Sequence, residues 1–399
     1  MAQRIIYWFR NDLRLHDNEA LFNASKSANE IVPIYVFDLR QFEKTRLGFR
    51  RTGALRAQFL IESVIDLRNR LREKGGDLLI RIGEPEKIIA QLAEHYAAEY
   101  VFTSKEIAPE ETGIESSLSK NLKLANVDIK LYWMDTLLHA IDLPFSISKL
   151  PANFSAFSDQ LKDHLKIKGP FPEAQQITLP QEFEAGSIPS LPMLGIDPNE
   201  ISQTAASSEP KLPGGETTAL KLLENYIQTY IKGKQHFETN DPLTDTRLSD
   251  WLSLGCISAR YIYGMVNSAQ PANATEEQML HNLLARDFFH WTLLRYGPRM
   301  FKPSGVKHEF SKRWSNDSDI FAKWIHGETS DTTVNAIIQK LNSRGYLTSV
   351  ERETASRFLV DELGINWTWG AMYFESHLTD YEASVNWGRW NNIAGVGEV

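Results

Sequence analysis

The first third of the chain alternates short apolar runs with longer amphipathic segments. The apolar runs are RIIYWF, IVPIYVF, DLLIRI, YVFTS and VDIKLYW, and their length and β-branched, aromatic content are typical of buried strands. Between them, the segments near 19–27, 54–74, 85–98 and 110–125 show the three- and four-residue spacing of helices. Residues 1–135 are therefore predicted to form a Rossmann-like α/β domain, with a parallel sheet covered by helices. Ligands of such sheets bind beyond the carboxyl ends of the strands.

The pattern changes after residue 135. Between about 165 and 215 lie eight of the seventeen prolines and little periodicity, although Phe, Leu and Ile recur. We expect residues 136–215 to form an irregular connector that wraps between two domains.

From residue 216 onward, apolar residues recur every three or four positions, and Gly or Pro lies between the periodic segments. Residues 216–399 are therefore predicted to form an all-α domain. The helical segments are ETTALKLLENYIQTYI, SDWLSLGCISARYIYGMV, EEQMLHNLLARDFFHWTLLRYG, TTVNAIIQKLNSRG, VERETASRFLVDEL and WGAMYFESHLTDY.

Composition narrows the functional classes. The 399 residues are 42% hydrophobic and 24% charged, which is ordinary for a soluble globular protein. A net charge of -8 provides no global basic footprint for nucleic acid, although a local patch would not appear in that sum. Cys256 is the only cysteine, so neither an intrachain disulfide nor a thiolate metal site is expected. The N-terminus does not resemble a secretory leader, and no apolar run reaches membrane-spanning length. We therefore expect a cytoplasmic protein with no membrane contact. We also expect a monomer.

An aromatic and polar stretch at residues 365–392 stands out. Each tryptophan there, taken alone, can be core filling. The polar residues between them are costly beside a core unless something satisfies their hydrogen bonds, and a large flat heteroaromatic cofactor would do so. The tryptophans are Trp367, Trp369, Trp387 and Trp390, and the polar residues are Asp380, Glu382 and Asn386.

A second candidate motif is DPLTDTRLSDWLSLG, residues 241–255. It places the hydroxyls of Thr246 and Ser249 and the guanidinium of Arg247 at a predicted helix start, a combination that suits a pyrophosphate. The alternative is an ordinary N-cap by Ser249, with Asp250 in the first turn.

These motifs resemble the photolyase and cryptochrome family, most closely its cryptochrome DASH branch. The resemblance is carried by YWFRNDLRLHDNEAL, SKRWSND, VERETASRFL and TDYEASVNWGRW. It implies a bound FAD, with Asp380 pairing Arg352 over the flavin ring, Asn386 facing the reactive nitrogen and Glu382 nearby. Residues 246–249, which are Thr246, Arg247, Leu248 and Ser249, match the segment that holds the FAD phosphates.

The resemblance also implies an electron relay and an antenna. Trp390 would lie nearest the flavin, Trp367 in the middle and Trp314 outermost. RRTGALRAQFL and FTSKEIAPEETGIE are similar to DASH segments that line a site for methenyltetrahydrofolate, in which Glu106 would meet the pterin ring. A solvated Glu near a helix start is the alternative interpretation of Glu106.

The chain departs from the family pattern at the lesion pocket. Asn282 and Ala285 stand where repair enzymes carry a Glu and a Trp that hold the flipped pyrimidine dimer. Other positions that would contact the lesion or the DNA are changed as well: Ser349, Val350, Glu353 and Asn392. Because stacking contributes about 1 to 3 kcal/mol per base and a carboxylate repels phosphate, these changes together should weaken lesion binding severely.

Two further departures lie outside those contacts. Met279 takes a Trp position near the cofactor, and the chain stops at AGVGEV, where relatives continue. A fragment or a frameshifted reading is one explanation that the sequence leaves open for this end.

The expected function is therefore a DASH-like FAD photoreceptor for blue light, with pyrimidine-dimer repair weak or lost. One alternative is a light-driven DNA photolyase that acts on single-stranded or otherwise damaged DNA. The other is a flavin-binding module in which photochemistry is incidental. Weak contact with single-stranded or damaged DNA is the expected nucleic-acid interaction, and the signalling partner cannot be identified from the sequence.

Overall fold

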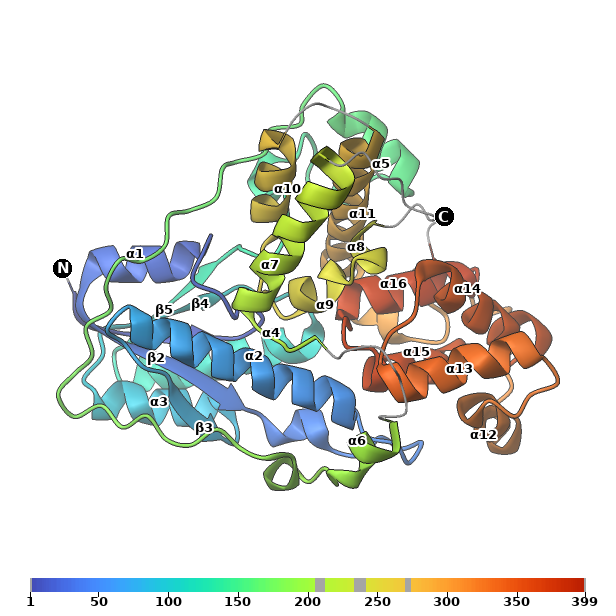
Figure 1. Ribbon diagram of the computed structural model, residues 1–399, viewed down its shortest axis with the longest axis horizontal. Helices are drawn as coiled ribbons and strands as arrows, with labels where there is room; N and C mark the ends of the chain where they lie inside the picture. The colour runs from blue at the N-terminus through green and yellow to red at the C-terminus, as the bar shows by residue number, and fades with distance from the viewer. Residues whose placement is uncertain (1, 205–211, 233–241, 270–273, 398–399) are drawn as a thin grey trace.

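The computed structural model describes residues 2–204, 212–232, 242–269 and 274–397 (Figure 1). Its N-terminal part is a five-stranded sheet in the order β3-β2-β1-β4-β5, in which all four neighbouring strand pairs are parallel. The strands are β1 (Ala2–Phe9), β2 (Ala28–Phe37), β3 (Leu79–Ile82), β4 (Tyr100–Ser104) and β5 (Asp128–Tyr132). The helices between them are α1 (Glu19–Ser27), α2 (Ala54–Glu73), α3 (Pro85–His95) and α4 (Pro109–Leu124). This confirms the predicted α/β domain and its parallel sheet.

Both faces of the sheet are buried, which explains the continuous apolar runs in the strand sequences. Along β1, Ile5 and Tyr7 belong to one core while Ile6 and Trp8 belong to another, because successive side chains point to opposite faces. The second core is completed by apolar residues of α3 and α4, and the first by those of α1 and α2.

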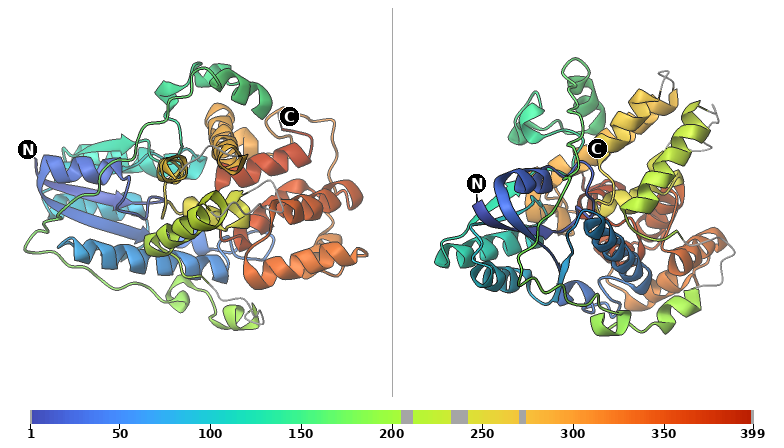
Figure 2. Two further views of the ribbon diagram at one scale, coloured as in Figure 1. Left: turned by 45° about the horizontal axis from the view of Figure 1, so that its top comes forward. Right: turned by 60° about the vertical axis from the view of Figure 1, so that its left-hand side comes forward.

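From residue 216 onward the described chain is mainly helical, as predicted (Figure 2). Its helices are α7 (Glu216–Tyr226), α8 (Pro242–Asp245), α9 (Leu248–Ser253), α10 (Ala259–Ser268), α11 (Ala274–Tyr296), α12 (Ser318–His326), α13 (Thr332–Arg344), α14 (Ser349–Arg357), α15 (Trp367–His377) and α16 (Ala383–Ile393). Two π-helical turns, η5 (Ile227–Lys232) and η7 (Phe358–Glu362), extend α7 and α14.

Two helical boundaries differ from the prediction, and two helices were not predicted. The segment 249–266 is two helices, because Gly255 adopts a φ of +62° where a Cβ would lie 2.0 Å from the carbonyl oxygen of Asn11. α15 ends at His377, so Asp380 lies in a turn instead of a helix. α12 and α16 are helices that the periodicity did not single out.

The predicted connector is irregular over much of its length, but it includes two helices, α5 (Phe154–Leu161) and α6 (Asn199–Thr204). α5 packs on α11 through Phe157 and Phe288, whose ring centroids are 5.3 Å apart. Asp287 of α11 accepts hydrogen bonds from the backbone N–H groups of Leu137 and Leu138, at 3.0 and 2.9 Å. The start of the connector is thus tied to the longest helix that the structure describes.

The two halves also meet along α2 and α15. The backbone N–H of Gly53 donates to the carbonyl oxygen of Ser376 at 2.8 Å, and Arg56 donates to the carbonyl oxygen of Glu375 at 2.9 Å. A Cβ at Gly53 would lie 2.8 Å from that same Ser376 oxygen, so this close approach requires glycine. These contacts join the two halves directly.

Candidate functional site

The half-buried Arg352 forms an ion pair with the buried Asp380, with 2.7 Å between Nη2 of Arg352 and Oδ2 of Asp380. α14 positions Arg352, and its start is fixed by a capping box between Thr348 and Glu351. Arg352 also donates from Nε to the carbonyl oxygen of Leu347 at 3.0 Å. The second carboxylate oxygen of Asp380 is buried and has no hydrogen-bond partner within the described residues.

The motif at 246–249 lies at the start of α9. Arg247 adopts the left-handed conformation, with a φ of 60°, and pairs through Nη2 with Oδ2 of Asp250 at 2.5 Å. Arg247 is the N-cap residue and Ser249 lies inside the helix, so the alternative N-cap by Ser249 is wrong. Thr246 and Leu248 flank this turn, and Leu248 is buried in the core.

Several polar atoms near this turn are buried without a partner among the residues that the structure describes. They are Oγ of Ser249, Oδ1 of Asp250 and Oδ1 of Asp380. Burial, with a contribution from the nearby charge of Asp380, raises the pKa of Asp250 to about 6. Buried unpaired groups are costly unless a ligand satisfies them. The donor and acceptor set around Arg352 and Asp380 therefore fits a polar, aromatic ligand such as a flavin nucleotide.

The three tryptophans of the expected relay run from the interior toward the surface. Trp390 and Trp367 are buried, and Trp314 is half-buried. A Cβ at Gly370 would lie 2.3 Å from Cη2 of Trp390, so α15 and α16 are packed against each other at this ring. Trp367 begins α15 one turn before Gly370.

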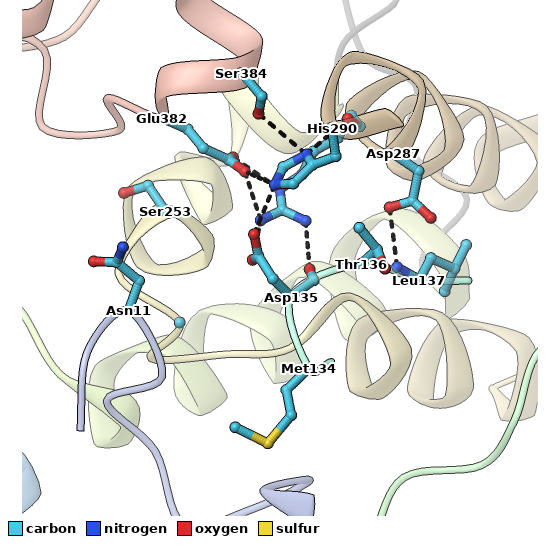
Figure 3. Close-up of polar contacts among 12 residues, drawn as sticks. Asn11, Met134, Asp135, Thr136, Leu137, Ser253, Asp287, His290, Glu382 and Ser384 are labelled. Carbon is cyan, nitrogen blue, oxygen red and sulfur yellow. Dashed lines mark hydrogen bonds and ion pairs between the residues drawn. The ribbon is translucent and has the colours of Figure 1, made fainter. Parts of the chain in front are cut away.

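Two residues of the expected flavin set have other partners. Nδ2 of Asn386 donates to the carbonyl oxygen of Ala371 at 3.0 Å, which holds its amide against α15. Glu382 is the N-cap residue of α16, and its carboxylate points toward Arg286 and His290 instead of the Arg352–Asp380 pair (Figure 3).

Glu382 belongs to a cluster of four charged side chains that sequence reasoning missed, and Figure 3 labels three of them, Asp135, His290 and Glu382. Arg286 lies 2.5 Å from Asp135 and 2.8 Å from Glu382, and His290 lies 2.6 and 2.7 Å from the same two carboxylates. Burial lowers the pKa of His290, but the charges of Glu382 and Asp135 outweigh it and raise the value to about 10. The pKa of Asp135 is correspondingly held well below its usual value, against the effect of burial, by Arg286 and His290.

Three members of this cluster also have the residue types of a metal site. Ligand atoms of Asp135, His290 and Glu382 lie within 4.8 Å of one another. The guanidinium of Arg286 already contacts both carboxylates, and a protonated His290 balances the remaining charge. With His290 protonated, the two cations and the two carboxylates of the cluster balance each other.

The cluster lies along a cavity of about 560 Å³ between the two halves of the molecule. The expected antenna segments line this cavity, including Arg51, Arg56 and Glu106. Burial raises the pKa of Glu106 to about 7, and Nδ2 of Asn11 lies 3.4 Å from its Oε1. Aromatic walls are provided from the helical half by Phe301, Tyr381 and Trp387. The volume is within the range of ligand pockets.

The altered lesion positions lie on three helices. Asn282 and Ala285 are half-buried on α11, and Ser349 on α14 lies 3.3 Å from Nη1 of Arg389 on α16. The other three positions, Val350, Glu353 and Asn392, are exposed. A ligand at this surface would therefore meet an apolar side chain, a carboxylate and an amide. Met279, the other altered position named from the sequence, is fully buried, so it does not belong to this surface.

A weak signal for the missed cluster was present in the sequence. Arg286 and His290 are four residues apart in ARDFFHW, so they share one face of α11 among large apolar residues. Their partners Asp135 and Glu382 lie far away in the chain, and no local sequence pattern links them to Arg286 and His290.

In the described part of the chain, no helix is both long and apolar enough to cross a bilayer.

Comparisons with known proteins find matches over nearly the whole chain. Residues 5–177 match the DNA photolyase family, and residues 279–398 match the FAD binding domain of DNA photolyase. Cryptochrome DASH of Gloeobacter violaceus is 36% identical, over 99% of this chain and 80% of that protein. Cryptochrome DASH of Xenopus laevis is 35% identical, over 98% of this chain and 76% of that protein.

Solved structures agree as well. The Synechocystis cryptochrome structure superposes with a TM-score of 0.90 at 33% identity, covering 99% of this chain and 82% of that one. A photolyase of Sulfolobus tokodaii, with a TM-score of 0.80, 24% identity and coverage of 99% and 84%, shares the fold.

Proposed function

The chain belongs to the photolyase and cryptochrome family and is a cryptochrome-DASH-like FAD flavoprotein, and from this premise we propose that it is a blue-light photoreceptor whose flavin is photoreduced through Trp390, Trp367 and Trp314. The observation that carries the proposal is that Trp390 and Trp367 are both buried, whereas Trp314 is half-buried and reaches the surface. When bound, FAD supplies the absorption of blue light and accepts the electron.

The chain's own residues hold the flavin and move the charge. Arg352 and Asp380 present a paired guanidinium and carboxylate, and the free carboxylate oxygen of Asp380 can accept an N–H from the flavin ring. Residues 246–249 lie beside this pair, with the buried hydroxyl of Ser249 available to a polar group. Trp390 gives up an electron, and Trp367 and then Trp314 replace it, so that the positive charge reaches solvent.

The cavity around Glu106 supports an antenna site. Its aromatic walls would hold a flat ring, and Glu106, whose pKa is about 7, can face the N–H groups of a pterin. The ligand would be a folate of the methenyltetrahydrofolate type. Glu106→Gln should weaken the binding of that folate while leaving FAD bound, and equilibrium dialysis with the two ligands separates the effects.

The first test is the absorption spectrum of the purified protein before and after blue light, with a reductant present. The flavin bands should bleach in the wild type and persist in Trp390→Phe. A folded protein that is colourless and takes up no added FAD would refute the photochemical proposal. Bleaching of equal rate in the variant would refute the relay alone.

Light-driven DNA repair is the second candidate, and membership of the DNA photolyase family favours it. The residues at the lesion positions argue for weak activity, because Val350 and Glu353 are exposed where DNA phosphate would approach. Repair of a pyrimidine dimer in single-stranded DNA under blue light tests it. If residual repair exists, Asn282→Glu should raise it; if Asn282→Glu adds nothing, the pocket has lost lesion binding for other reasons.

A further inference from the structure

We propose that Trp387 gives the tryptophan relay a second exit, which opens on the interdomain cavity, and that a planar reductant of the reduced-pterin class binds there and returns the electron. The inference rests on the proposed relay through Trp390 and Trp367. It differs from the antenna proposal because the occupant of the cavity would supply an electron and not only absorbed light.

Trp387 touches both the relay and the cavity. Its ring meets that of Trp367 edge-on, with centroids 5.8 Å apart, and it lies one helical turn before Trp390 on α16. On its other side, Trp387 packs against Phe301 with centroids 5.0 Å apart, and both residues line the cavity. Among the described residues, this contact joins the middle ring of the relay directly to a cavity wall.

The orientation of Trp387 is held by its neighbours. Its Nε1 donates to the hydroxyl oxygen of Tyr381 at 3.3 Å, and the guanidinium of Arg56 lies 4.4 Å from the centroid of the Tyr381 ring. Burial raises the pKa of Tyr381 well above its usual value, so the phenol stays neutral beside the indole. A transient positive charge on Trp387 thus has a hydrogen-bond acceptor at its N–H.

The cavity has the chemistry for a flat heterocycle with N–H donors. Trp387, Phe301 and Tyr381 supply aromatic surface, and Glu106 supplies an acceptor. A tetrahydropterin offers both a ring of this size and an easily removed electron. In the proposed step, the pterin loses one electron to oxidised Trp387 and a proton to solvent, and the indole returns to its neutral closed-shell state.

The outer tryptophan has a different environment. Trp314 is half-buried, and Nζ of Lys312 lies 5.8 Å from its ring centroid. A small anionic reductant in bulk solvent would reach Trp314 by collision, aided by that cation. The two exits should therefore select different donors, which makes them experimentally separable.

The test uses flavin-loaded protein and transient absorption of the tryptophan radical after a blue flash. Two donors are compared, 6-methyltetrahydropterin and ferrocyanide, in wild type, Trp387→Phe and Trp314→Phe. In the wild type, the pterin should speed radical decay about tenfold or more, with saturation, because a bound donor reacts within its complex. That saturable effect should vanish in Trp387→Phe and persist in Trp314→Phe, whereas the ferrocyanide effect should show the reverse pattern.

Binding is measured separately in the dark by equilibrium dialysis of 6-methyltetrahydropterin. Because Trp387 is itself part of the cavity wall, the dissociation constant is measured for each variant, and radical decay is compared at pterin concentrations that saturate that variant. In the unmodified protein, oxidised 6-methylpterin should compete for the cavity and slow radical decay to the donor-free rate. Saturable pterin-dependent decay in Trp387→Phe, or no pterin binding to wild type, would overturn the inference while leaving the relay intact. Absence of any tryptophan radical in wild type would refute the relay itself.

Discussion

Trp314 and Trp367 donate hydrogen bonds to the same acceptor, the carbonyl oxygen of Pro303, and each N–O distance is 3.1 Å. The two indole edges are therefore held within two hydrogen-bond lengths of each other, although the residues are far apart in the chain. One ring belongs to the surface segment before α12 and the other to the first turn of α15. This shared oxygen places the middle and outer positions of the proposed relay next to each other.

Removing the middle ring should interrupt the relay. Trp367→Phe keeps an aromatic side chain but not an oxidisable indole, so flavin bleaching should be nearly absent over the time in which wild type bleaches fully. Trp369→Phe is the matched control, because Trp369 lies on the same helix and packs on Phe321, with centroids 5.3 Å apart. Equal slowing in both variants would show that packing, and not electron transfer, is responsible.

Gly370 should be intolerant of a side chain. A methyl group there would lie 2.3 Å from Cη2 of Trp390 and 2.5 Å from Cδ2 of Leu359. Gly370→Ala should destabilise the protein by about 1 to 3 kcal/mol through overpacking and slow photoreduction by displacing Trp390. Gly264→Ala is the control, because its nearest new contact would be 3.9 Å away. Urea unfolding and the rate of flavin bleaching report the two effects.

The Arg352–Asp380 pair should matter for flavin retention. Asp380→Asn removes the carboxylate charge that faces the guanidinium of Arg352, and it should lower the FAD content of the purified protein. Glu353→Gln on the same helix removes an exposed pair with Arg357 and should change stability by less than about 1 kcal/mol. The ratio of flavin to protein absorbance checks both. Full FAD content in Asp380→Asn would argue against the proposed role.

The charged cluster predicts a pH dependence of stability. The folded-state pKa of His290 is about 10, compared with an ordinary value of 6.5. The imidazolium therefore contributes stability that is fully present below pH 6.5 and is lost as the pH rises through about 10. His290→Gln should lower the unfolding free energy by about 3 to 5 kcal/mol at pH 6, and the difference from wild type should shrink toward pH 10. Urea titrations at pH 6, 8 and 10 measure it; a pH-independent difference would contradict the charge assignment.

Much of the fold followed from local patterns. The five strands and the four helices of the α/β half lie close to the predicted ranges, because buried parallel strands and amphipathic helices each leave a periodic trace in the chain. The break at Gly255 and the end of α15 before Asp380 were missed. The first depends on the close approach of Asn11, which is remote in sequence. α16 was missed because its polar and small residues, such as Asn386 and Gly388, do not form a regular apolar face.

From the sequence alone, the approximate ranges of most helices and strands could be predicted. An aromatic stretch with carboxylates and amides could also be recognised, as could an Arg and an Asp that resemble a flavin-binding pair. Which side chains contact one another across the molecule became known only from the tertiary structure. It turned Glu382 toward Arg286 and His290, and it placed Trp387 between Trp367 and a cavity. Periodicity depends on neighbours within one or two turns, whereas these contacts depend on how separate helices pack, and a single sequence carries no local record of that packing.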